Sequence, residues 1–190
     1  MMKTKMTLMA IMFVGFGVTG VAQNEEAMTK LSIFHEYVKA GNFDAAYEPW
    51  MEVRTKWPKF NNAIPVDGQK ILEPQIEHST GAEKVAYIRD LLKLWDEKAE
   101  NFPAKTKLGD LLSDKAQLMY DYKTELGMSK EQIYDAFDEA YRRDLKTFKN
   151  AKSLYTYFSL MVDIYDEGNK TYQELFEKYY DIVEKIENEV

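Results

Sequence analysis

Hydrophobic residues recur at steps of three and four along nearly the whole chain, which is the spacing of amphipathic helices. For example, Ala46, Trp50, Val53 and Trp57 share one helix face, and Pro58 ends that run. No segment alternates convincingly between apolar and polar residues. We therefore predict an all-α protein of about eight helices, over about 25–40, 43–57, 66–78, 81–101, 108–126, 130–147, 151–166 and 172–186.

Two of these helices are expected to begin with a capping box, in which the side chains of the first residue and of the residue three positions later bond to backbone amides. The two boxes are Thr80 with Glu83 and Ser129 with Gln132. Proline lies inside two other predicted helices. We expect Pro49 to kink or shift the first turn of its helix, and Pro74 to interrupt the helix over 66–78.

The predicted helices pair into four hairpins, at about 25–58, 63–103, 106–148 and 151–188. Two aromatic residues seven positions apart recur in the second helix of three hairpins: Trp50 and Trp57, Trp95 and Phe102, Tyr141 and Phe148. Internal repeats of this length indicate arrays in which each hairpin buries its apolar face on its neighbours. The alternative interpretation is an irregular helical bundle whose aromatic residues simply form the core.

The first hairpin resembles a tetratricopeptide repeat (TPR), with the family's positions held by Tyr37, Gly41, Phe43, Ala46, Trp50 and Pro58. The later hairpins depart from the pattern, because they repeat every 42 to 46 residues or so, whereas the family repeats about every 34. The resemblance implies a short right-handed solenoid whose first helices line a binding surface. The matching positions here are Met28, Leu31, His35 and Val38, which we expect either to bind a partner or to be buried against neighbouring helices.

The N-terminus has the pattern of a secretory signal peptide. Lys3 and Lys5 precede an uncharged stretch over 6–20, and small residues lead to Ala22. We expect cleavage after Ala22, export to the periplasm or the medium, and a single repeat domain over 23–190 that has no membrane span. The alternative is an uncleaved anchor. With this export signal, the chain looks like the N-terminal part of an exported TPR-like protein of the Bacteroidota type.

The composition excludes several classes of function. Lysine and arginine number 25 against 32 acidic residues, a net charge of −7, which argues against binding to nucleic acid. The chain has no cysteine, so disulfides and thiol nucleophiles are excluded. Its two histidines, His35 and His78, lack the spacing of a zinc site. We predict no catalytic residue, no cofactor and no metal.

These observations favour a non-enzymatic scaffold of the cell envelope that binds another envelope protein or a peptide. The alternative is a carbohydrate-binding or glycan-processing protein that uses exposed tyrosines and an acidic pair. The last predicted helix carries a broad apolar stripe of Tyr179, Tyr180, Ile182, Val183 and Ile186. We expect this stripe to belong either to a longer array or to a chain that associates with itself through its C-terminal helix.

Overall fold

The computed structural model describes the backbone of residues 18–188 and the side chains of residues 24–188. Within that range the chain is helical, with no strand. The elements are α1 (Val18–Lys39), α2 (Phe43–Lys56), α3 (Ala63–His78), α4 (Gly81–Asn101), the 3₁₀ helix η1 (Pro103–Lys105), α5 (Leu108–Asp121), α6 (Lys123–Leu126), α7 (Lys130–Arg143), α8 (Ala151–Asp166) and α9 (Tyr172–Glu187). Most of the expected signal segment, residues 1–17, lies outside the described residues, and residues 18–22 begin α1.

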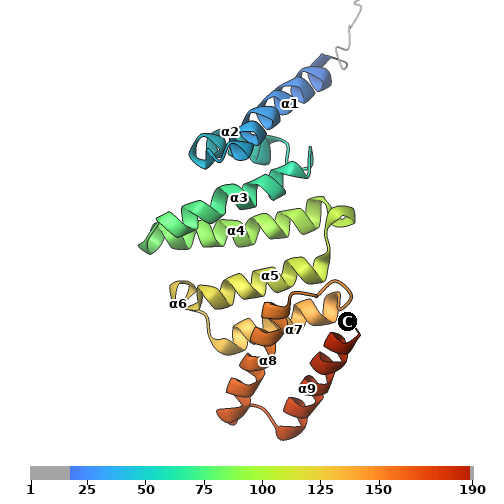
Figure 1. The fold of residues 1–190 in the computed structure, drawn as a ribbon. Helices are drawn as coiled ribbons and strands as arrows, with labels where there is room; N and C mark the ends of the chain where they lie inside the picture. The colour runs from blue at the N-terminus through green and yellow to red at the C-terminus, as the bar shows by residue number, and fades with distance from the viewer. Residues whose placement is uncertain (1–17, 189–190) are drawn as a thin grey trace, which may run out of the picture.

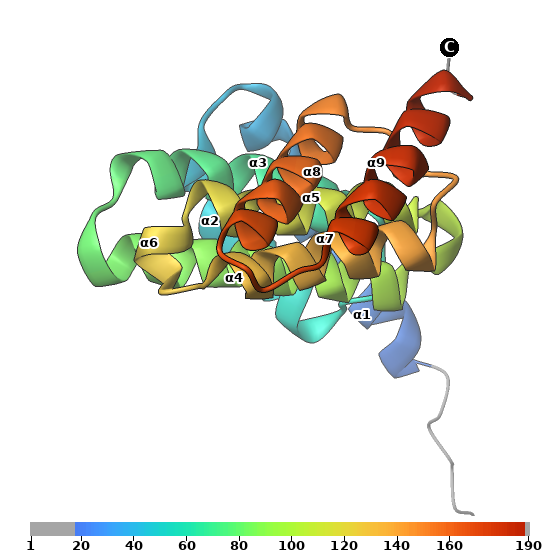
Figure 2. The same ribbon diagram turned by 90° about the horizontal axis from the view of Figure 1, so that it is seen from below.

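Helices that are neighbours along the chain pack together as the pairs α1 with α2, α3 with α4, α5 with α7, and α8 with α9. Contacts also join successive pairs, because α3 packs on both α1 and α2, α5 packs on α4, and α8 packs on both α5 and α7. Figure 1 shows the pairs following one another from α1 and α2 at one end to α8 and α9 at the other. Seen from below, α8 and α9 lie across the direction of α3, α4 and α5 (Figure 2).

The buried side chains form two clusters that meet at α5. The first cluster contains Trp50 and Trp95 and draws its buried members from α1 to α5. The second contains Phe137, Phe148 and Tyr157 and draws its buried members from α5 to α9. Large buried rings remove much apolar area from water, and together with the rest of both clusters they hold a chain without disulfides together.

The aromatic pairs of the first two hairpins have similar surroundings in the structure. Trp50 and Trp95 are both buried, whereas Tyr141 of the third pair is only half-buried. Trp57 and Phe102 both cap the C-terminus of their helix, with nearly equal backbone angles of φ −138°, ψ 59° and φ −133°, ψ 51°. A proline follows each of them. The first two hairpins therefore end in the same way.

Four predicted helices have different ends in the structure. α1 begins at Val18 instead of near residue 25, and α3 begins at Ala63 instead of near residue 66. The helix expected over 108–126 breaks at Tyr122 into α5 and α6, which brings Tyr122 and Leu126 against the first cluster. The helix expected to reach Thr147 stops at Arg143. The next residue, Asp144, accepts hydrogen bonds from the backbone of Gly109 and the hydroxyl of Thr147, so the chain turns there to hold the start of α5.

The expectations for caps and prolines are met only in part. Ser129 and Gln132 form the expected capping box. Thr80 makes no side-chain hydrogen bond at the start of α4, so the prediction of a capping box by Thr80 and Glu83 was wrong. The residue after it, Gly81, has φ +58°, which turns the chain away from the geometry a capping box needs. The prediction that Pro74 interrupts its helix was also wrong, because α3 runs without a break to His78.

Candidate functional site

The outer side of the last hairpin carries the largest group of exposed rings on the described chain. On α9, the residues Tyr172, Phe176, Tyr179, Val183 and Ile186 follow one another at steps of four, three, four and three. This is the heptad spacing by which one helix packs along another. We call these five residues, with Tyr180 beside them and Tyr155 and Phe158 on α8, the aromatic face.

Most of the aromatic face is open to water. Tyr155, Tyr172, Phe176, Tyr179, Tyr180 and Ile186 are between 40% and 76% exposed. Neighbouring rings contact one another, with centroids 4.6 Å apart for Tyr172 and Phe176 and 5.8 Å apart for Phe176 and Tyr180. Tyr179 contacts Phe158 across the hairpin at 5.9 Å. The rings therefore form a continuous surface rather than isolated exposed residues.

The inner side of α9 is unusually polar for a packed helix face. Ile182 is the one hydrophobic residue of α9 that is fully buried, and Lys185, three positions later, is buried as well. Lys178, also on this side, has only 13% of its side chain exposed. α9 thus packs on the protein through Leu175, Ile182 and two lysines, and leaves most of its rings exposed.

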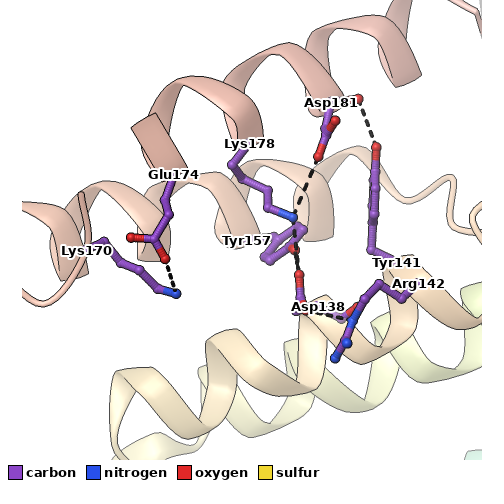
Figure 3. A network of polar contacts seen from close by, with 8 residues as sticks. All are labelled: Asp138, Tyr141, Arg142, Tyr157, Lys170, Glu174, Lys178 and Asp181. Atoms are coloured by element: carbon purple, nitrogen blue, oxygen red, sulfur yellow. Dashed lines mark hydrogen bonds and ion pairs between the residues drawn. The ribbon is translucent and has the colours of Figure 1, made fainter. Parts of the chain in front are cut away.

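A network of polar contacts holds α9 in this orientation (Figure 3). The ammonium of Lys178 lies 3.2 Å from Oδ1 of Asp138 on α7, which also accepts a hydrogen bond from the hydroxyl of Tyr157 on α8. Nε of Arg142 is 2.8 Å from Oδ2 of Asp138. The same ammonium lies 4.9 Å from the ring centroid of Tyr157, close enough for a cation–π interaction. Lys178 therefore joins α9 to both α7 and α8.

A second contact reinforces this orientation. The hydroxyl of Tyr141 on α7 donates a 2.8 Å hydrogen bond to the backbone carbonyl of Asp181 on α9. The ring of Tyr141 also lies 5.2 Å from the ammonium of Lys178. Because these contacts are directional, they fix which side of α9 faces the protein.

The environment sets the protonation states in this network. Burial alone would raise the pKa of Asp138, but the hydrogen bonds from Tyr157 and Lys178 and the nearby positive charges of Lys178 and Arg142 outweigh it and lower the pKa. Burial, together with the hydrogen bond to Asp138, raises the pKa of Tyr157 far above its ordinary value. Asp138 is therefore a carboxylate whose oxygens are already engaged by three donors, and Tyr157 is a neutral hydroxyl. This arrangement suits a structural support rather than a general base.

The aromatic face encloses an apolar groove of about 430 Å³ between α8 and α9. Leu154 and Ile182, which are buried, form its floor. Its remaining lining residues are Lys149, Ala151, Tyr155, Phe158, Tyr179, Val183 and Ile186. Lys149 is the one charged residue among them. A groove of this kind suits the apolar side of a helix better than a charged or strongly hydrogen-bonding ligand.

The structure places the four residues predicted to bind a partner in different surroundings on α1. Met28 is 54% exposed, whereas Val38 is buried in the first cluster. Leu31 is half-buried against the same cluster. Nδ1 of His35 is 2.5 Å from Oδ2 of Asp67, which joins α1 to α3. These residues do not form one exposed surface.

No group of three or more histidine, aspartate and glutamate side chains is placed to hold a metal ion in the part of the chain that the structure describes. None of the described helices is both long and apolar enough to cross a membrane. The most buried ion pairs join helices, as where Arg54 bridges Asp90 and Glu97 on α4 at 2.9 and 2.7 Å.

No protein-family model matches this chain, and neither a curated protein nor a solved structure was found to be similar to it.

The sequence alone indicated the apolar stripe of the last helix but not its orientation. The steps of four and three from Tyr172 to Ile186 could have been found by counting. The steps from Leu175 through Lys178 and Ile182 to Lys185 show equally regular spacing, and either side of the helix could face the protein. Asp138 and Tyr141 decide between them, and their proximity to α9 becomes visible only in the fold.

Proposed function

We propose that this protein is a non-enzymatic interaction module that binds a helix of a partner protein on the aromatic face of α8 and α9. The observation that carries the proposal is a largely apolar, ring-lined groove with exposed walls, on a helix whose inner side is held by Lys178. Helix-in-groove recognition uses apolar side chains at helical spacing to fill such a groove. Aromatic residues are enriched where binding energy concentrates in protein interfaces.

The size of the exposed surface supports a docking role. At about 200 Å² for a full aromatic side chain, six residues exposed by 40% to 76% present roughly 670 Å² to water. The largest apolar patch on a typical monomeric protein is about 300–600 Å². A partner that covers this face would remove a large unfavourable contact with water.

We further propose that the four helix pairs form a short TPR-like solenoid and that the protein is exported to the cell envelope. The matching C-terminal caps at Trp57 and Phe102 and the packing of α3 on both helices of the preceding pair support the repeat. Lys3, Lys5 and the uncharged segment after them support export. The partner would then be another envelope protein.

Carbohydrate binding is the second candidate function. Tyr155, Tyr172 and Tyr180 expose 62% to 76% of their surface, as a sugar-stacking platform requires, and Asp181 adjoins Tyr180 in the sequence. The groove itself argues against it, since a sugar needs several hydrogen-bonding groups. Among the lining side chains only Lys149, Tyr155 and Tyr179 carry one.

The test is photo-crosslinking in the producing cell. A photoreactive phenylalanine analogue replaces Tyr155 in the groove, and a control chain carries it in place of exposed Lys59, which does not line the groove. The proposal expects a discrete protein adduct from position 155 and none from position 59. Enrichment of glycan without a protein adduct would favour the carbohydrate function. Equal labelling from both positions would contradict a specific site.

A further inference from the structure

We propose that the occupant of the aromatic face is a second copy of this chain, which docks its own α8 and α9 against it in a two-fold symmetric dimer. This inference rests on the proposed function, because it names the partner of the same surface. In a two-fold interface each copy contributes the same patch, so the patch must be complementary to itself. A continuous surface of rings without a strong charge pattern meets that condition.

Charge is the first argument for a second copy. The chain carries a net charge of −7, so two copies repel each other over most of their surfaces. The heptad positions of α9 from Tyr172 to Ile186 are all uncharged. Lys149 is the one charged residue that lines the groove, so two copies can approach each other through this face with few like charges placed together.

Area is the second argument. Two such faces, each with roughly 670 Å² of exposed side chain, would bury roughly 1,300 Å² from six residues of each copy alone. Stable and specific interfaces bury about 1,200–2,000 Å² in total. The aromatic face is therefore large enough for a dimer without help from other surfaces.

The other end of the described chain makes a poorer match, which argues against head-to-tail assembly. Among the described side chains of α1, the large exposed apolar ones are Met28, Ile33 and Tyr37. Exposed Glu36 and Lys39 lie close to them in the sequence and pair with each other at 2.9 Å. Packing α1 onto the rings of α9 would bury this exposed ion pair, and the lost hydration of both charges is costly.

The heptad spacing places Tyr179 at the centre of the α9 stripe, with two stripe residues on either side. When two such helices cross about a two-fold axis, the central residue of one copy lies nearest to the same residue of the other. Tyr179 is 47% exposed, so its ring is free to make this contact. The dimer thus predicts self-contact at one residue.

Single-cysteine crosslinking tests this directly, because the natural chain contains no cysteine. In the full chain, Tyr179→Cys is expected to form a disulfide-linked dimer on mild oxidation, whereas Lys59→Cys, on an exposed loop, is expected to stay monomeric. Self-contact at position 179 distinguishes a two-fold interface from a head-to-tail one. Equal crosslinking of both variants, or none at position 179, would overturn the proposal.

Sedimentation equilibrium with charge variants provides an independent test. Tyr179→Glu and Tyr179→Lys should each raise the dimer dissociation constant by roughly a hundredfold or more, since like charges then meet at the axis. Mixing the two variants should restore the dimer. The control Met28→Glu, at an equally exposed residue of α1, should dimerise like the natural chain. Far-UV circular dichroism checks that each variant is folded.

The two proposals fail in different ways. A natural chain that stays monomeric, while position 155 still crosslinks to another protein, would overturn the dimer and leave the docking function. A chain that is monomeric and gives no protein adduct from position 155 would overturn both. A dimer that persists in both charge variants would place the interface elsewhere.

Discussion

The contact between Lys178 and Asp138 should stabilise the protein measurably, because it fixes the orientation of α9. The perturbation is Lys178→Met, which keeps most of the apolar stem and removes the charge. At the Nζ–Oδ1 separation of 3.2 Å, two unit charges attract each other by about 5 kcal/mol at an effective dielectric constant of 20. The loss of hydration on burying Lys178 and Asp138, which expose 13% and 22% of their side chains, cancels much of this attraction.

A net interaction of about 1–2 kcal/mol remains. This lies above the typical value of up to about 1 kcal/mol for exposed pairs and below the cost of about 3–5 kcal/mol for breaking a fully buried pair. Asp138 also keeps its contacts with Arg142 and Tyr157 after the substitution, which limits the loss. Lys178→Met also removes the cation–π contacts with Tyr141 and Tyr157, so its total cost should be about 2–3 kcal/mol.

The assay is a double-mutant cycle with Asp138→Asn, measured by urea unfolding and followed by far-UV circular dichroism. The cycle isolates the pairwise term from the other effects of each substitution. The exposed pair of Lys39 and Glu36, 2.9 Å apart, provides a matched control that should couple by no more than about 0.5 kcal/mol. A coupling between Lys178 and Asp138 equal to that of the control would refute the claim that this contact orients α9.

Three further predictions concern other parts of the structure. Gly68→Ala should lower the free energy of unfolding by about 1–3 kcal/mol, because its added Cβ would lie 2.5 Å from the buried ring of Trp50. Urea unfolding measures this loss, and a loss below about 0.5 kcal/mol would show that the ring moves freely. The pKa of Asp138 is lower in the folded protein than in the unfolded chain, so its carboxylate stabilises the fold fully above the unfolded pKa. This stabilisation is lost as the pH falls through the lower folded pKa. The free energy of unfolding of the natural chain should therefore fall more steeply in acid than that of Asp138→Asn. Parallel pH curves would contradict this. Burial raises the pKa of Tyr134 and Tyr141 to about 12, so their stabilising effect is complete below pH 10 and is lost toward pH 12. Absorbance at 295 nm should show tyrosines that ionise only near pH 12. Full ionisation of all tyrosines near pH 10 in the folded protein would contradict the burial.

Much of the helical content was predictable because helix formation depends on local spacing and on nearby breakers. The bounds of α2 and α8 match the sequence prediction closely, since Gly41 and Pro58 flank the first and Asn150 caps the second. The break at Tyr122 was not predictable from local sequence. It arises because Tyr122 and Leu126 pack on a cluster formed mainly by residues far earlier in the chain.

The candidate site shows the same division. The apolar stripe of α9 is visible in the sequence, whereas the choice of the outward side depends on Asp138, which lies 40 residues from Lys178 along the chain. The sequence also pointed to His35 as a binding residue. A long-range contact with Asp67 gives His35 a partner within the fold, which helical spacing alone does not reveal.

The central claim is that the aromatic face of α8 and α9 is a docking surface. Photo-crosslinking from position 155 in the producing cell, with position 59 as the control, tests it most directly. We expect a discrete protein adduct from position 155 alone, which mass spectrometry would identify as a second copy of this chain. No protein adduct from position 155, or the same adducts from position 59, would contradict the claim.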